Sequence, residues 1–453
     1  MTTSGSVTIQ REAPVRHEVD VFVAGGGPAG CAAAVIAARQ GARVFLAEGH
    51  SCFGGMGTAG LVPAFMQFGD GVNFLAAGFG EELLDRLIAA GGSYAPQTGG
   101  DRTGAYPILA EVLKRVYDDL LKEAGVSFSL HAHLIGVEAA GGAVQAGIVW
   151  GKSGLYAVRA KVFVDGTGDG DLAAWAGAPF EKGDASGAMM PGTLCSLWTD
   201  IDHQAVTDAH LGPQNVRIEQ AHRDGVFTYC DKHLPGIWWL APGQGGGNVG
   251  HTFGVDATDE RSLTEALVWG RKLVTQYERY YKEYLKGYER MRLMATGSLL
   301  GIRETRRIMG DYVLCLDDFK RRAVFADEIG RYCYPVDIHV ARPDDEAEYT
   351  RFVKEFADLR YKKGESYGIP YRCLTPRGLR NVLVAGRCIS ADRFLQGSIR
   401  VMPGCYITGQ AAGLAAALAA AGGGDVHGVS VGELQRRLLK AGACLPNGPS
   451  ARE

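Results

Sequence analysis

The first fifty residues alternate between short apolar runs and a stretch of small residues. Residues 21–24 and 44–47 are uninterrupted apolar runs, which is typical of buried strands. Residues 31–39 between them are rich in alanine, the strongest helix former, and Gly41 supplies a natural stop. This order predicts a strand, a turn, a helix and a second strand.

The rest of the chain shows other periodicities. Residues 79–90 and 108–124 place apolar side chains three and four positions apart, which predicts amphipathic helices. From 126 to 164 the period shortens to two, with glycine breaks, as expected of a β-meander. The middle holds clusters of Trp and Tyr and a long helical stretch at 261–291. Residues 372–421 return to a strand, a glycine turn and a helix of small residues.

The composition of the 453 residues narrows the class of protein. This length exceeds one compact core and predicts two domains, one of them inserted into the other. A net charge of -3 provides no basic field for nucleic acid or an anionic membrane. The most apolar stretch, 411–421, is too short for a membrane span and predicts a buried helix. The segment 243–250 is rich in glycine and is expected to be a loop of the inserted domain.

The cysteines and the N-terminus suggest a compartment. The ten scattered cysteines contain no CxxC pair and no zinc-ligand spacing, so we expect reduced thiols and no metal site. Residues 1–17 are polar and lack the apolar run of a signal peptide. These features together favour a cytoplasmic protein.

A glycine motif follows the first predicted strand and opens the first predicted helix. It reads Gly25-Gly26-Gly27-Pro28-Ala29-Gly30. In this context Gly25 permits the tight turn, Gly27 allows a pyrophosphate to approach the backbone, and Gly30 lets the helix pack on the sheet. The next strand ends at Glu48, which suits hydrogen bonds from ribose hydroxyls and disfavours the 2′-phosphate of NADP. The motif predicts dinucleotide binding and leaves FAD and NAD as alternatives.

Four segments in order resemble one enzyme family. They are 25–62, 162–172 (VFVDGTGDGDL), 302–308 (IRETRRI) and 381–413, the last of which includes Gly397-Ser398-Ile399-Arg400-Val401-Met402-Pro403. Together they are similar to the FAD-dependent oxidoreductases related to the succinate dehydrogenase and fumarate reductase flavoproteins, within the glutathione-reductase-like superfamily. The resemblance implies an α/β fold with a Rossmann-like FAD-binding domain, a β-meander and an inserted α+β substrate or cap domain. The expected limits are 15–180 and 336–445 for the FAD-binding domain and 181–335 for the cap.

The resemblance also implies a set of cofactor contacts. Beyond the first motif, these are Gly54, Gly55, Met56 and Gly57 near the pyrophosphate and the flavin edge, Leu134 and Ile135 at the adenine, Thr167, Gly168 and Asp169 in a second turn, and Gly386 and Arg387 at the ribityl chain. Pro403 suits the first turn of a helix, so the N–H groups near Val401 and Met402 are expected to face the flavin where negative charge develops. His50 and Cys52 raise the question of a covalent flavin, but non-covalent FAD is the expectation.

Arginines supply candidates for substrate binding. Arg400 either adds positive charge beside the flavin and an anionic substrate or forms a structural salt bridge. Arg303, Arg306 and Arg307 share one face if the segment is helical, and that face either recognises a carboxylate or phosphate or is an ordinary exposed face.

His339 is the leading candidate for the proton acceptor. Imidazole titrates in the range that proton abstraction requires. Asp337 lies two residues away and in a strand shares a face with His339, so it is placed to orient the ring. A purely structural pair is the alternative, and His251 is a weaker candidate.

The expected function is dehydrogenation of a small organic substrate by hydride transfer to flavin N5, with oxygen or a carrier as the electron acceptor. The alternatives are a reductase of an activated C=C bond, with an arginine as the acid, and an electron-transfer flavoprotein that serves a partner protein.

Overall fold

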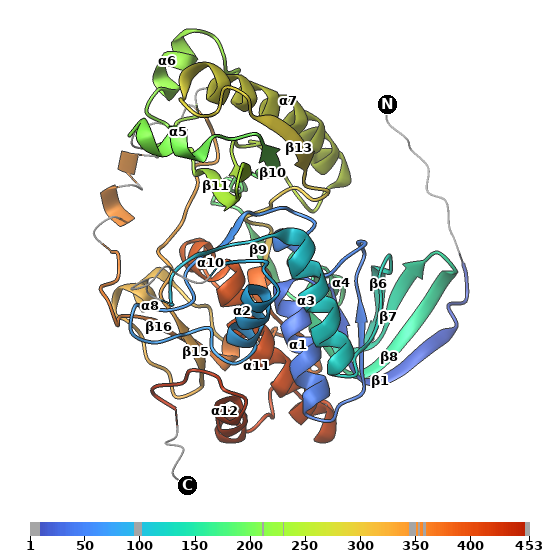
Figure 1. Cartoon of the computed structure of the whole chain (residues 1–453). Helices are drawn as coiled ribbons and strands as arrows, with labels where there is room; N and C mark the ends of the chain where they lie inside the picture. Colours follow the sequence, from blue (N-terminus) through green and yellow to red (C-terminus); the bar gives the residue numbers. More distant parts are fainter. Residues whose placement is uncertain are drawn as a thin grey trace.

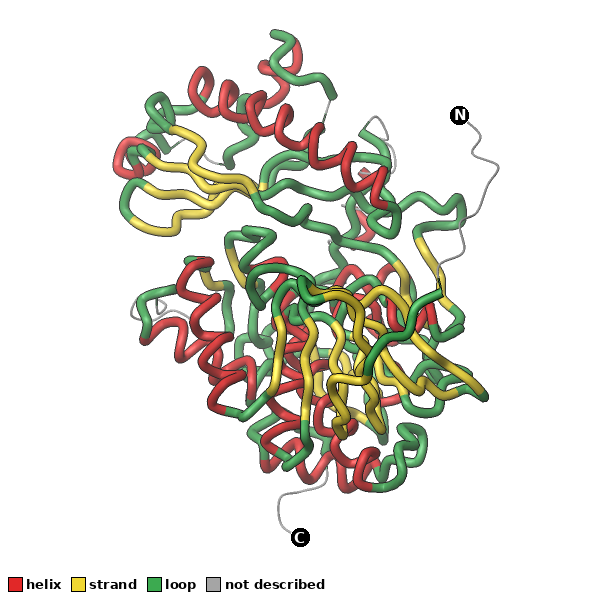
Figure 2. Tube along the Cα trace, turned by 90° about the vertical axis from the view of Figure 1, so that its right-hand side faces the viewer, coloured by secondary structure: helices red, strands yellow, loops and turns green. Residues whose placement is uncertain are grey.

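The computed structural model describes residues 10–94, 102–210, 213–229, 231–343, 350–351, 354–356 and 359–448. Residues 1–9 of the polar N-terminal segment therefore lie outside the described residues. Two domains are visible in Figure 1: a larger domain that holds both ends of the described chain and a smaller cap above it. Figure 2, turned by a right angle, shows the same two parts from a second side, with the cap above the larger domain.

The larger domain is built on a mixed sheet. Its strand order is β5-β2-β1-β8-β7-β6, and β17 pairs with the end of β8. The strands β5, β2, β1, β8 and β17 run parallel, whereas β6, β7 and the first half of β8 form an antiparallel meander. The bounds are β1 (Val15–Ala24), β2 (Val44–Ala47), β5 (Ser127–Ser129), β6 (His133–Ala140), β7 (Ala143–Gly151), β8 (Gly154–Asp165) and β17 (Val382–Val384). The structure is thus α/β, with the Rossmann-like arrangement and meander that the sequence predicts.

Helices lie on and around this sheet. They are α1 (Pro28–Arg39), α2 (Phe79–Ala89), α3 (Ala110–Glu123), α4 (Asp171–Trp175), α8 (Leu316–Lys320), α10 (Arg393–Ile399), α11 (Met402–Ala421) and α12 (Val431–Lys440). The sequence predicts four of them, α1, α2, α3 and α11. Short elements complete the domain: the strand pairs β3 (Ala64–Phe65) with β4 (Tyr106–Pro107), β9 (Phe180–Lys182) with β14 (Arg306–Ile308) and β15 (Glu328–Tyr332) with β16 (Tyr367–Pro370), and the 3-10 turns η1 (Gly55–Gly57), η2 (Tyr371–Cys373) and η3 (Gly386–Cys388).

Helix α11 is the internal helix that the small residues of 411–421 predict. It is long and apolar enough to cross a membrane by composition, but 89% of its most apolar window is buried inside the protein. A Cβ on Gly409 would lie 2.3 Å from Ala29 O, and one on Gly413 would lie 2.2 Å from Ala33 O. The two glycines therefore let the backbones of α11 and α1 touch, and α11 also packs on β1 and β8.

The cap has its own sheet and its own core. The four strands follow the order β11-β12-β10-β13, and three helices lie beside them. The bounds are β10 (Ser196–Thr199), α5 (His203–Asp208), α6 (Ile218–Arg223), β11 (Gly236–Ala241), β12 (Gln244–Asn248), α7 (Glu260–Tyr284) and β13 (Arg292–Thr296). The core gathers Trp198, Met291 and three tyrosines of α7, namely Tyr277, Tyr280 and Tyr281. Large buried aromatic rings dominate the energetics of a core, so these residues are the main source of the cap's stability.

Two expectations about this region are wrong. The glycine-rich segment 243–250 is not a loop, because it contains strand β12. The strand shows no apolar alternation in the sequence because neighbouring side chains pack directly on its glycine backbone. A Cβ on Gly245, for example, would lie 2.4 Å from Ile237 Cγ2. The expected end of the cap at 335 also lies beyond the cap core, because Ile308, Phe319 and Ile329 pack in the core of the larger domain.

Candidate active site

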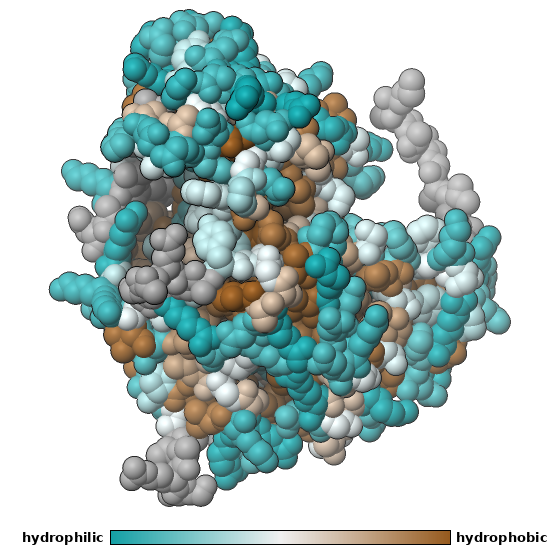
Figure 3. Space-filling view, viewed as in Figure 1, coloured by the Kyte–Doolittle hydropathy of each residue, from teal (hydrophilic) through white to brown (hydrophobic). Residues whose placement is uncertain are grey.

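A cavity of about 600 Å³ lies where the cap meets the larger domain. This volume lies in the usual range for sites that bind small molecules and cofactors. The cavity runs past the carboxyl ends of β1, β2 and β8 and past the first residues of α1 and α11, and residues of the cap close it from above. Apolar side chains show at the surface in the crevice between the two domains (Figure 3). In open α/β sheets, ligands bind at these carboxyl ends.

The glycines of the first motif divide into two kinds. Gly25 has a φ of 88°, and a Cβ there would lie 2.7 Å from Gly166 O. A Cβ on Gly30 would lie 1.8 Å from Gly25 O, so both positions require glycine to keep the backbone in place. Gly27 differs, because the nearest atom to its Cβ would be Gly166 O at 3.9 Å and the remaining space belongs to the cavity.

The first turn of α1 faces this free space. Gly27 is the N-cap, no side chain caps the helix, and Pro28 occupies the first helical position. The exposed N–H groups and the positive end of the helix dipole therefore provide an anion site. Gly25, Gly27, Pro28 and Ala29 line the cavity, whereas Gly30 lies behind it.

Glu48 lies at the adjacent end of the cavity. It is buried, and its carboxylate accepts hydrogen bonds from Gly26 N at 2.6 Å and His50 N at 2.8 Å. Each oxygen keeps lone-pair capacity for a further donor, such as a ribose hydroxyl. Leu134 lines this end, but Ile135 is 48% exposed and lies outside the lining. His50 lines this end too, whereas the buried Cys52 does not reach the cavity.

A second turn lies across from α1. Thr167, Gly168 and Asp169 line the cavity together with Gly386 and Arg387. Arg387 donates Nε to Gly168 O at 3.0 Å and Nη1 to Ile302 O at 2.8 Å, and it forms an ion pair with Asp169. The arginine thus fixes this turn to the chain segment at Ile302 that leaves the cap.

Asp165 precedes this turn, and the pKa of its carboxyl is raised. Burial raises the pKa of its carboxyl to about 6, although it accepts hydrogen bonds from Thr167 Oγ1 at 2.7 Å and Ala173 N at 2.9 Å. Because the pKa in the folded state lies above the ordinary 3.8, the charged carboxylate lowers the free energy of unfolding, and this effect is complete above pH 6. The destabilisation disappears as the pH falls toward 4 and the carboxyl becomes protonated in the folded state.

The replacement Asp165→Asn removes this titration. We expect the free energy of unfolding of the variant, minus that of the wild type, to rise by up to about 3 kcal/mol between pH 4 and pH 7. Urea unfolding at four pH values, with both proteins in the same flavin state, measures this difference. A difference that stays constant over this range would show that Asp165 does not change its charge there.

The start of α11 forms the far wall. Val401 is the N-cap, no side chain caps the helix, and Pro403 lies in its first turn, as the sequence predicts. Val401 and Met402 line the cavity, so unpaired N–H groups of this turn lie at its edge. Gly55 and Met56 line the same region, whereas Gly54 and Gly57 pack behind it, against Tyr117 and Met402.

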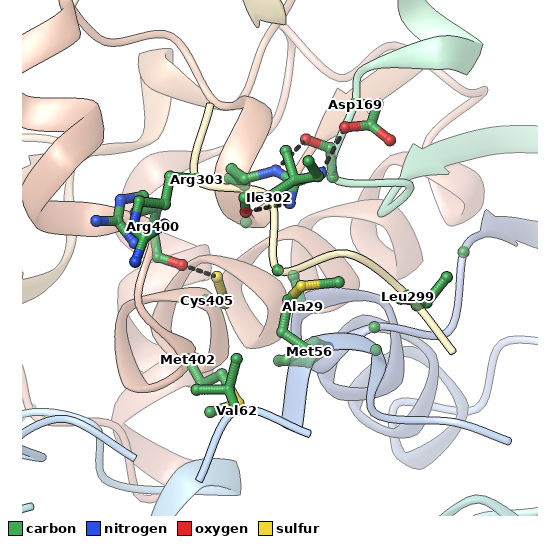
Figure 4. A pocket seen from close by; sticks show the side chains of 18 of the residues that line it. Ala29, Met56, Val62, Asp169, Leu299, Ile302, Arg303, Arg400, Met402 and Cys405 are labelled. Atoms are coloured by element: carbon green, nitrogen blue, oxygen red, sulfur yellow. Dashed lines mark hydrogen bonds and ion pairs between the residues drawn. The ribbon is translucent and has the colours of Figure 1, made fainter. Parts of the chain in front are cut away.

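A polar cluster lies beside α11. Arg400 donates Nη2 to Asp337 Oδ2 at 2.7 Å, and His339 Nε2 lies 3.2 Å from Asp337 Oδ1. Arg303 donates Nη1 to Pro191 O at 2.8 Å and to Thr193 Oγ1 at 2.9 Å. Figure 4 shows Arg303 and Arg400 together on one side of the cavity. All three candidate catalytic residues, Arg303, His339 and Arg400, therefore line one region.

Burial and charge set the acidities of this cluster. Burial, and then the positive charge of Arg400, lowers the pKa of Arg303 to about 10. Burial and the charge of Arg303 also hold the pKa of His339 well below its ordinary value. Burial alone raises the pKa of Asp337, but the hydrogen bond from His339 and the positive charges of Arg400 and Arg303 hold that pKa well below its usual range. His339 is therefore neutral near pH 7.

Two local expectations are corrected here. Arg303, Arg306 and Arg307 do not share a helix face, because β14 pairs with β9 and residue 303 precedes the strand. Arg306 binds Asp171 at 2.6 Å and Arg307 binds Glu304 at 2.5 Å, so of the three only Arg303 lines the cavity. Residues 337 and 339 do not lie in a strand either, yet their side chains meet as expected.

The cap adds residues that the sequence did not single out. Among those that line the cavity are His233 and Asn248 of the cap; Tyr334 of the larger domain lines it too. Behind them, His251 Nε2 lies 3.0 Å from His339 Nδ1. These groups come together only because segments more than eighty residues apart pack against each other. No local pattern in the sequence predicts this contact.

Comparison with known proteins agrees with this geometry. The sequence model of the FAD dependent oxidoreductases matches residues 20–438. Thiamine thiazole synthase of Methanococcus aeolicus is 31% identical over 194 residues, which are 40% of this chain and 66% of that protein. The chain therefore spans slightly less than two thirds of this curated relative.

Among solved structures, a geranylgeranyl bacteriochlorophyll reductase-like protein of Thermoplasma acidophilum aligns over 94% of this chain and 84% of its own, with 11% identity and a TM-score of 0.48. THI4 of Thermovibrio ammonificans aligns over 36% of this chain and 64% of its own, with 22% identity and a TM-score of 0.28. Both scores lie below 0.5, and neither similarity carries an argument about function.

Proposed function

The chain belongs to the family of FAD dependent oxidoreductases, and from this premise we propose that it holds FAD non-covalently and oxidises a small anionic molecule. Glu48 would hold the ribose, the first turn of α1 the pyrophosphate, and the first turn of α11 the flavin ring. His50 belongs to the ribose end, where its N–H binds Glu48, and Cys52 does not line the cavity, which favours a non-covalent flavin.

One observation carries the substrate class. Two arginines, Arg303 and Arg400, line the same part of the cavity, and both side chains are largely buried. Arg400 Nε is buried and has no hydrogen-bond partner among the described residues, which is costly unless a ligand accepts from it. Paired guanidinium groups suit a carboxylate or a phosphate.

The bound FAD supplies a two-electron acceptor for a hydride from a substrate C–H bond. The residues of this chain orient the substrate and take up the proton that leaves with the hydride. His339, neutral and held by Asp337, is the proposed acceptor, and the positive charge of Arg303 and Arg400 stabilises the developing oxyanion. Oxygen or a carrier would serve as the final electron acceptor.

A second reaction has one observation in its favour. A guanidinium with a pKa near 10 is a stronger acid than ordinary arginine, so Arg303 suits protonation of a carbon during reduction of an activated C=C bond. The covered cavity with its converging polar groups is less suited to an electron carrier, which needs an exposed flavin edge. The narrower relation to succinate dehydrogenase and fumarate reductase, like a cytoplasmic location, is part of this proposal.

Anaerobic spectroscopy tests the proposed direction. The purified protein is mixed without oxygen with a panel of hydroxy acids, amino acids and sugar acids, and the flavin absorbance near 450 nm is followed. Bleaching by an anionic member, and not by its neutral amide or ester, is the expected result. Bleaching by none of them, combined with fast oxidation of the chemically reduced flavin by an unsaturated acid, would favour the reductase.

A further inference from the structure

Three histidines from three separate segments converge beside the cavity. His233 precedes β11, His251 follows β12, and His339 follows β15. One ring nitrogen from each lies within 4.8 Å of the other two, and these three form the one candidate metal cluster among the residues that the structure describes. His251 and His339 are buried, and His233 is half-buried.

The spacing of the rings suits a shared metal ion. His251 Nε2 and His339 Nδ1 lie 3.0 Å apart, as do two nitrogen ligands about 2.1 Å from a metal at roughly a right angle. The ring centroids are separated by 4.5 Å, 5.0 Å and 5.3 Å. Three imidazoles on one metal, at coordination angles between about 90° and 110°, place their centroids roughly 4.5 to 5.3 Å apart.

Carboxylates face the opposite sides of two of these rings. His251 Nδ1 lies 2.9 Å from Asp231 Oδ2, a close ion-pair contact in which the ring N–H is not well aligned, and His339 Nε2 lies 3.2 Å from Asp337 Oδ1. If each ring presents its N–H to its carboxylate, two lone pairs face each other across 3.0 Å. Such an arrangement requires a cation between them, either a proton or a metal ion. A carboxylate behind a ligating histidine is the usual support of a metal site.

We propose that His233, His251 and His339 bind a divalent transition metal, such as zinc or ferrous iron. Three imidazoles suit these ions, and His233 must turn inward to complete the set. The positive charges of Arg303 and Arg400 already balance the negative charges of Asp231 and Asp337. A bound divalent metal would therefore give the site a net positive charge. His233 and His339 line the cavity, and the open coordination positions therefore face the substrate.

The consequence for the chemistry rests on the proposed function. A metal occupies the lone pair of His339 that would otherwise accept a proton, so the two roles are alternatives. A substrate hydroxyl bound to the metal loses its proton more easily, and a neighbouring carboxylate of the substrate meets Arg303 or Arg400. The substrate class then narrows to molecules that chelate through a hydroxyl and an anionic group.

Metal binding is measured without turnover. The flavin-loaded protein is treated with a chelator, dialysed and titrated with Zn²⁺ by calorimetry, and the Cu²⁺-loaded form is studied by electron paramagnetic resonance. We expect one equivalent of Zn²⁺ to bind and hyperfine splitting from three nitrogen ligands. His251→Ala and His233→Ala should each lose at least 100-fold in affinity, and Asp231→Asn about 10- to 100-fold.

His203→Ala, on a half-buried histidine of the same domain that lies outside the cluster, is the matched control and should bind as the wild type does. Flavin content and melting temperature verify that each variant is folded. The proposal is overturned if the wild type takes up no stoichiometric metal, or if the histidine variants bind it equally well. Because the readout is metal uptake, its failure leaves the flavin reaction standing, whereas absence of flavin bleaching leaves the metal site standing.

Discussion

Gly27→Val is expected to leave the protein folded and to weaken FAD binding by roughly 100-fold or more, which corresponds to about 3 kcal/mol. The backbone at Gly27 has φ -69° and ψ -175°, an extended conformation that valine adopts without strain. Apart from its chain neighbours, no protein atom comes closer than 3.9 Å to the added Cβ, so the new side chain fills the free space in front of α1. That space is where the pyrophosphate must approach the backbone.

The measurement is FAD affinity by fluorescence titration of protein stripped of flavin. Gly136→Val is the matched control, because this glycine lies in β6 with no atom within 4 Å of an added Cβ. It should bind FAD as the wild type does. Normal binding by Gly27→Val would place the pyrophosphate elsewhere, and loss of binding by both variants would reveal a general effect on folding.

Arg400→Met is expected to lower kcat/KM by about 100-fold or more while flavin content stays normal. The replacement leaves the half-buried Asp337 carboxylate without its 2.7 Å partner and removes one of the two positive charges that face the substrate. Loss of one member of such a pair typically costs about 2–5 kcal/mol. Steady-state kinetics with the substrate that bleaches the flavin fastest provide the measurement.

Arg306→Met is a suitable comparison for this variant. Arg306 is also paired with an aspartate and comes from the segment that carries Arg303, but it does not line the cavity. Its loss should change stability more than catalysis. Equal losses of kcat/KM in the two variants would mean that Arg400 acts only through the fold.

Local patterns predicted the scaffold well because each rests on neighbours in sequence. The strands around the first motif, the caps of α11 and the burial of 411–421 follow from apolar runs, Pro403 and small residues that act over a few positions. The contacts of Gly409 and Gly413 with α1 explain why this helix is built of such residues. Most of the expected cofactor residues line the cavity for the same reason, since strand ends and helix starts determine their places.

The cap was harder to predict. Strand β12 lacks the apolar alternation of a strand, because its glycines lie under neighbouring side chains. Arg303 and Arg307 share a sequence motif but point to different places once β14 pairs with β9. The histidine cluster unites positions 233, 251 and 339, whose spacing resembles no metal motif. Contacts between paired strands create the first two arrangements, and the packing of the cap on the larger domain creates the third.

The absorbance spectrum of the purified protein, recorded before and after heat denaturation and filtration, tests the account most directly. Non-covalent FAD in the cavity predicts flavin bands that pass through the filter and carry the mass of FAD. Flavin that stays on the denatured protein would contradict non-covalent binding. A colourless protein that takes up no added FAD would contradict the assignment of the cavity itself.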